Sequence, residues 1–229
     1  MKEALKSAKQ FLKNNYFGLI FLTINISLLW LHIFLGDGND FFNFDREYNL
    51  PSAWASLQCV LAAGAWLLWH RSLKSDKIKK VSQSVFIYSG FLLLIYLAFD
   101  EFFQWHEFFG DSLGLYLKSL DWGIMFWRYN PVFAWLLIFA PFVILLGTLF
   151  ARGAWRLWPR LVFWQVVFAG ALFVFGSFGI EVLGALHFNE VWQIVPYWYL
   201  VTVEEFLELL SICFLLNIFY KQFQKAKLK

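Results

Sequence analysis

Charged residues are scarce in this chain. Asp, Glu, Lys and Arg make up 15% of its 229 residues, whereas 60% are hydrophobic and 22% are aromatic. Soluble domains carry about 25% charged residues, because their surface must stay hydrated. The composition therefore excludes a soluble globular domain and indicates a protein whose outer surface lies in lipid.

Cysteines and known catalytic motifs are also few. The two cysteines, Cys59 and Cys213, lie in apolar segments, where we expect them to pack as small hydrophobic side chains. The nucleophile elbow, the Walker loop, the HExxH helix and the dinucleotide fingerprint are absent from the sequence. No repeat or linker divides the chain, so we treat residues 1–229 as a single transmembrane domain.

Six apolar runs are long enough to cross a membrane as helices, which need about 20 mostly apolar residues. The runs cover residues 16–36, 50–69, 84–108, 130–151, 160–186 and 197–220. The connection 110–129 is rich in Leu and aromatic residues, which predicts a short interfacial helix between the third and fourth runs. The sequence thus predicts an all-α integral membrane protein, a bundle of six transmembrane helices.

The distribution of basic residues predicts the orientation of this bundle. Of the 19 Lys and Arg residues, 16 lie in the two tails and in residues 70–80 and 151–160. Because Lys and Arg next to spans favour the cytoplasmic side, both termini are expected in the cytoplasm, at the bacterial inner membrane. The expected partners are membrane lipids. The sequence also allows other membrane subunits, or a second copy of the chain, as partners. Orientation and anionic lipid explain the basic tails, so no nucleic acid is expected.

Tryptophans gather near the ends of the predicted spans. Trp66, Trp69, Trp155 and Trp158 fall near the cytoplasmic ends. Because indole rings favour the boundary between lipid and water, we expect these residues to anchor the helices at that interface.

Acidic residues lie inside the predicted spans, toward their outer ends. At 1.5 Å per residue, Asp100 and Glu181 fall near the outer boundary of the hydrocarbon, and Glu208 lies roughly 16 Å inward from Tyr197. An ionised carboxylate at the bilayer centre costs about 2.5–3.5 kcal/mol or more, so these side chains should face the protein interior and share a proton, a cation or hydrogen bonds. We therefore expect one polar pocket that opens outward.

Carboxylates and an imidazole at one depth predict a site for a divalent metal ion of undetermined identity. The expected ligands are Asp100, Glu101, His106, Glu107, Glu181 and Glu204. Glu205 and Glu208 are the expected catalytic residues, one of them acting as general base. His106 lies about 120° from Asp100 on an ideal helix, so it joins this site only if the helix is distorted.

Helix packing beside the site depends on small residues. Gly170, Ser177 and Gly184 repeat every seven residues next to Glu181, which predicts the close approach of another helix.

Three functions stay open from the sequence. The first is divalent-cation binding, for metal-dependent chemistry on a membrane substrate. The second is a cation or proton transporter or channel, in which Glu208 is the protonatable group. The third is a non-catalytic membrane subunit whose polar cluster serves packing or partner docking. In this third case Glu208 would form an interhelical hydrogen bond, with Gln58 as the expected partner at similar depth.

Overall fold

The computed structural model of the chain is helical. It describes residues 2–36, 38–46, 48–72, 81–119, 135–188 and 193–228, and in these residues it contains helices and no strands. In chain order the elements are α1 (Lys2–Leu35), η1 (Asp40–Phe42), α2 (Leu50–Ser72), α3 (Val81–Phe103), α4 (Trp105–Ser119), α5 (Trp135–Leu157), α6 (Arg160–Val174), η4 (Phe175–Ile180), α7 (Glu181–Phe188) and α8 (Tyr197–Lys227). The all-α prediction is confirmed.

Several of these helices have the length and composition of membrane spans. Within the described ranges, five stretches qualify: Asn15–Leu35, Leu50–Ser72, Gln83–Phe103, Phe139–Leu157 and Arg160–His187. These are the helices of a polytopic membrane protein. Helix α8, which contains the sixth predicted run, is not among the five, so the count of six stays a prediction, as does the cytoplasmic orientation.

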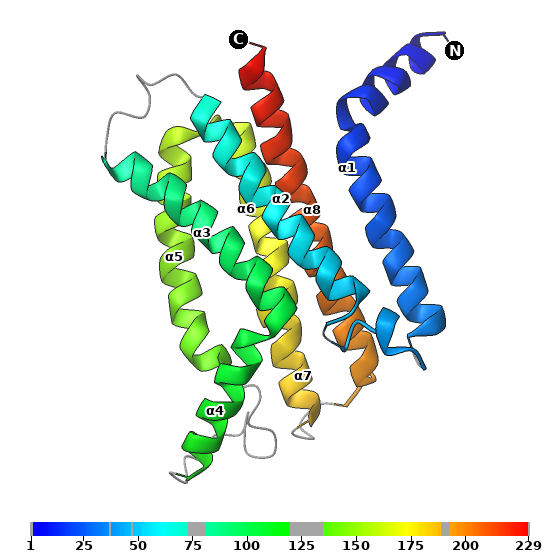
Figure 1. The fold of residues 1–229 in the computed structure, drawn as a ribbon, viewed down its shortest axis with the longest axis vertical. Coiled ribbons are helices and arrows are strands. Elements are labelled where there is room, and N and C mark those ends of the chain that lie inside the picture. The colour runs from blue at the N-terminus through cyan, green and yellow to red at the C-terminus, as the bar shows by residue number, and fades with distance from the viewer. Residues whose placement is uncertain are drawn as a thin grey trace.

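The bundle is built around α2 and α8. Helix α2 packs against α3 and α8, and α8 also contacts α1, α6 and η4. Figure 1 shows α1 on one side of this centre and α3 and α5 on the other. Both chain ends lie at the same end of the bundle, and α4 extends from the opposite end (Figure 1).

Three of the four tryptophans expected at the interface form part of the core instead, while Trp155 is 48% exposed. Trp66, Trp69 and Trp158 are 0%, 4% and 5% exposed, so the prediction that they anchor the interface was wrong. The Trp66 ring lies 5.3 Å from the Trp158 ring and 5.0 Å from the Phe219 ring, and its Nε1 donates a hydrogen bond to Ile87 O at 2.8 Å. In lipid, helices associate through close packing rather than through exclusion of water, and large rings supply many contacts.

A buried polar network joins α1, α2 and α8. Asn25 Nδ2 donates to Leu209 O at 2.9 Å, while Asn25 Oδ1 accepts from Trp54 Nε1 at 2.7 Å and from Gln58 Nε2 at 3.1 Å. Gln58 is therefore hydrogen-bonded to Asn25. If the protein is a non-catalytic subunit, the sequence predicts Glu208 as the partner of Gln58, and the structure does not show that bond. The network holds three helices together through bonds that lipid cannot replace.

The predicted third span, 84–108, is two helices. Helix α3 ends at Phe103 and α4 begins at Trp105. Helix α4 covers the first part of the connection in which an interfacial helix is expected, and residues 120–134 lie outside the described residues. That α4 lies on the membrane surface stays a prediction.

Candidate functional site

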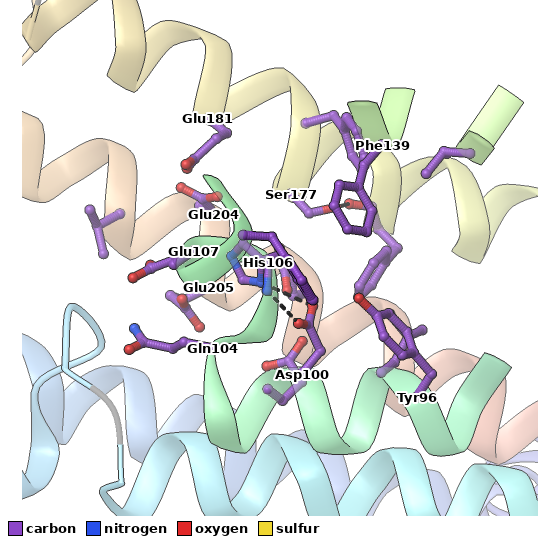
Figure 2. Close-up of a pocket in the computed structure, with 18 of the residues that line it drawn as sticks. Tyr96, Asp100, Gln104, His106, Glu107, Phe139, Ser177, Glu181, Glu204 and Glu205 are labelled. Atoms are coloured by element: carbon purple, nitrogen blue, oxygen red, sulfur yellow. Dashed lines mark hydrogen bonds and ion pairs between the residues drawn. The ribbon is translucent and has the colours of Figure 1, made fainter. Parts of the chain in front are cut away.

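A cavity of about 820 Å³ lies at the end of the bundle where α3 ends and α8 begins, opposite the chain termini. Its walls come from α3, α4, α5, α6, η4, α7, α8 and the loop before α2. The eight residues that the sequence assigns to a site all line it: Asp100, Glu101, His106, Glu107, Glu181, Glu204, Glu205 and Glu208. Figure 2 shows how several of them point into a shared space. The structure thus brings these residues together, while their roles as metal ligands or catalytic groups stay predictions.

The break between α3 and α4 places His106 in the cavity. Gln104 adopts a left-handed backbone conformation, with φ 50°, which a residue other than glycine seldom takes. The turn ends α3 before His106, so the 120° separation between Asp100 and His106 on an ideal helix does not apply. The distortion required by the sequence argument is therefore present, and it lies directly before His106.

Asp100 holds His106 through two hydrogen bonds. The backbone N–H of His106 donates to Asp100 Oδ1 at 2.9 Å, and its ring Nδ1 lies 2.9 Å from Asp100 Oδ2 (Figure 2). His106 lies beyond the apolar span that ends at Phe103. Burial by itself would lower the pKa of this ring, but the hydrogen bond and charge of Asp100, with the charges of Glu107 and Glu181, raise the pKa of His106 to about 9. The ring is therefore a cation at neutral pH, and Nδ1 donates to the carboxylate.

A π-helical segment, η4, precedes Glu181. Such segments are single-turn distortions that occur frequently at functional sites. A Cβ atom on Gly176 would lie 3.2 Å from Glu204 O and 3.2 Å from Leu207 Cβ, so glycine permits the close approach of η4 to α8. The close approach expected at Gly170 is not found, because a Cβ there would have nothing within 4 Å. The contact beside Glu181 depends on Gly176, which the seven-residue pattern did not include.

Four of the acids form two pairs. Glu101 of α3 is hydrogen-bonded through its side chain to Glu208 of α8, and Glu181 of α7 is hydrogen-bonded in the same way to Glu204 of α8. Figure 2 shows Glu181 and Glu204 facing one another. A bond between two carboxyl groups needs a proton on one of them, because an ionised carboxylate can only accept. Each pair therefore carries a proton, or a cation that takes its place.

The lining contains polar residues that the sequence argument did not assign to the site. Asp45, in the loop before α2, lines the cavity together with Tyr96 and Ser177. Because Asp45 is far along the sequence from the acids of α8, no local sequence pattern predicts that it lies near them.

His32 does not line the cavity. Its Nδ1 accepts from Phe44 N at 3.1 Å, and its Nε2 lies 2.9 Å from Thr202 Oγ1. With Nδ1 as acceptor, Nε2 carries the proton and donates to Thr202, so this ring fastens the loop to α1 and α8.

One wall of the cavity is apolar. It is formed by aliphatic and aromatic side chains of α3, α5, α6 and η4: Leu93, Leu97, Phe139, Phe142, Val143, Leu146, Phe173 and Phe178. The cavity is therefore divided between an acidic face, largely on α8, α7 and the end of α3, and a hydrocarbon face.

The described residues do not form a ready-made metal site. Among them, no three or more His, Cys, Asp and Glu side chains are grouped so that they can hold a metal ion. The two cysteines are free and buried, in line with the expectation that they pack as hydrophobic residues.

Residues 15–221 match a family that is described as a Domain of unknown function (DUF8692). The chain belongs to this family. The matched region of the DUF8692 family includes all eight residues of the predicted site. No curated protein and no solved structure matches the chain.

Proposed function

We propose that this protein binds a cation in the acidic cavity, in exchange for protons. The observation that carries the proposal is the pairing of Glu101 with Glu208 and of Glu181 with Glu204, two carboxyl pairs from different helices. Two carboxylates in contact cannot both ionise without a positive charge between them. A proton supplies that charge when no other cation is bound.

The charge balance of the lining supports the same proposal. The acidic lining residues are Asp45, Asp100, Glu101, Glu107, Glu181, Glu204, Glu205 and Glu208. Among the described residues that line the cavity, His106 is the one basic side chain, and Asp100 already pairs with it. Among the described lining residues, acidic side chains therefore outnumber basic ones eight to one, which favours a bound cation.

A divalent metal ion is the cation that the sequence predicts, and carboxylate oxygens suit it. Because no three such side chains of the described residues are grouped to hold a metal ion, the proposal requires the acids of the two pairs to move closer together when the ion binds. A protonated imidazole has no lone pair for a metal, so we assign the binding to the carboxylates and leave His106 with Asp100. Binding would then release the protons that the two carboxyl pairs hold.

The test is a binding measurement on the purified full chain in detergent. We expect Mn²⁺ to bind with measurable proton release, and Glu208→Gln to weaken binding by at least about tenfold, since a neutral amide cannot exchange a proton for a cation. The matched control is Asp40→Asn, which removes an exposed carboxylate in the loop before α2, where it pairs with Arg46.

Three results would count against cation binding. They are a protein that contains no stoichiometric metal and binds no added cation, binding without proton release, and a Glu208→Gln variant that binds as the parent does. The first of these would favour the third function, a polar cluster that serves packing or partner docking.

A second candidate is an enzyme that acts on a membrane substrate, and the Asp100–His106 pair favours it. A fixed imidazolium is a proton donor, and Glu205 or Glu208 supplies the general base that the sequence predicts. Incubation of the protein with a lipid extract, followed by mass spectrometry, tests this function. We expect products that His106→Asn abolishes, and identical extracts with and without the parent protein would exclude the enzyme.

A further inference from the structure

The cavity is larger than a small cation needs. Its volume of about 820 Å³ falls in the range of roughly 300–1,000 Å³ that holds organic ligands, whereas a water molecule takes about 30 Å³. The size indicates an organic molecule, and the lining specifies its chemistry.

Acidic and apolar groups occupy different levels of the cavity. Along α3, Leu93 lies seven residues before Asp100, which separates them by about 10 Å. Across from α3, Phe142 and Leu146 of α5 continue the apolar wall, while Glu204 and Glu205 of α8 belong to the acidic face. A ligand that fits both levels carries charge at one end and hydrocarbon at the other.

The apolar level is open to the side. Leu93, Phe142 and Leu146 line the cavity and are nevertheless 41%, 57% and 51% exposed. They belong to α3 and α5, within the stretches Gln83–Phe103 and Phe139–Leu157 that are apolar enough to span a membrane. Their exposed surface lies on helices that lipid would surround, so we place the entry of a hydrocarbon chain between α3 and α5.

The acidic level selects the sign of the head group. Glu208 is 9% exposed, and its hydrogen-bond partner is another carboxyl group, that of Glu101. A primary ammonium group offers three N–H donors and a positive charge, which form strong charge-assisted bonds with carboxylates. A phosphate in the head group would bring negative charge against the same acids.

We propose that the cavity binds an amphiphile with a primary ammonium head and an apolar chain. The head lies among the carboxyl groups of α8, including Glu205 and Glu208, and the chain runs between α3 and α5 past Leu146. This inference rests on the proposed function, because both need the carboxylates to hold a positive charge. It adds the class of the ligand and its route of entry.

Binding of radiolabelled decylammonium to the immobilised full chain in maltoside detergent tests the inference. We expect decylammonium to bind at least about tenfold more tightly than methylammonium, which lacks the chain. Decanol, which lacks the charge, should fail to displace it. A short-chain phosphatidylethanolamine should compete weakly, and equal competition by it would overturn the exclusion of phosphate.

Two tryptophan substitutions on α5 distinguish binding of the ligand's hydrocarbon chain from binding of its positive charge. Leu146→Trp fills the apolar level, whereas Ile144→Trp places the same ring on α5 at a residue that is 70% exposed and does not line the cavity. We expect Leu146→Trp to weaken decylammonium binding by at least about tenfold and to leave Mn²⁺ binding unchanged, with Ile144→Trp affecting neither. Leu93→Trp, on the facing helix, repeats the test if Leu146→Trp does not fold.

The outcomes distinguish the two proposals. If Mn²⁺ binds with proton release but decylammonium binds no better than methylammonium, or if Leu146→Trp and Leu93→Trp both bind decylammonium as the parent does, the amphiphile is excluded and cation binding stands. If neither Mn²⁺ nor an ammonium compound binds, cation binding itself fails.

Discussion

The two ends of the bundle use their buried space in opposite ways. Near the chain termini, Trp66 is fully buried among Trp69, Trp158 and other rings, with its N–H bonded to a backbone carbonyl. At the other end, Glu101 and Glu208 are held together in a cavity with room for a ligand. The aromatic end is filled with packed rings, whereas the acidic end keeps open volume and carboxyl groups that need a shared positive charge. Stability is therefore expected to depend on the first end, and function on the second.

The strongest test of this difference is Trp66→Ala at the aromatic end. Loss of a fully packed indole leaves a cavity among rigid rings, and we expect a loss of about 3–5 kcal/mol in the free energy of unfolding. Trp155→Ala is the control, since Trp155 is 48% exposed and its loss should cost less than about 1 kcal/mol. Denaturant unfolding in detergent measures both, and equal losses would show that burial does not distinguish these tryptophans.

A smaller effect is expected from Gly176→Ala at the acidic end. The added methyl group would press on Glu204 O and Leu207 Cβ, each 3.2 Å away, and should cost about 1–3 kcal/mol as η4 is pushed from α8. Gly170→Ala is the matched control in α6, where a Cβ meets nothing within 4 Å. The control should be neutral or slightly stabilising, because alanine favours helix. Thermal unfolding compares the two, and a neutral Gly176→Ala would refute the close approach.

Glu208→Gln should change stability less than either substitution. An amide can still hydrogen-bond to Glu101, so we expect the free energy of unfolding to stay within about 1 kcal/mol of the parent. Glu208→Ala, which removes both polar atoms, is the comparison and should cost more. If Glu208→Gln unfolded the protein, the acidic end would be a structural element rather than a binding site.

The smallest expected effect is a pH dependence at the Asp100–His106 pair. The pKa of His106 is raised to about 9 in the folded protein, from an ordinary value of about 6.5, by Asp100 against the opposing effect of burial. The stabilisation is therefore complete below about pH 6.5 and is lost as the pH rises through about 9. The difference in melting temperature between the parent and Asp100→Asn should shrink over that interval. A difference that stays constant from pH 6 to 10 would contradict the raised pKa.

Much of the membrane architecture could be predicted because it depends on composition along the chain. Apolar runs of sufficient length determine which segments form spanning helices, and the five stretches found fall within or close to the predicted runs. The acids of the site could also be predicted, because a carboxylate such as Glu208 is too costly to face lipid and must turn inward. These arguments need only the residue type and its depth.

Other features depend on contacts that no local pattern records. The interruption at Gln104 joins His106 to Asp100, and the sequence could state only that a distortion was required. Asp45 reaches the cavity from a loop, and Gly176 replaces Gly170 as the point of close approach, because both depend on where α8 passes. Trp66, Trp69 and Trp158 are buried rather than interfacial for the same reason.

The sequence by itself determined that this is a helical membrane protein with acidic residues near one end of its spans, since transfer free energies act on each residue alone. Only the tertiary structure decided that these acids meet in pairs and that apolar side chains of α3 and α5 line the same cavity. Pairing and openings are properties of helix packing, which arises from the contacts of all helices together.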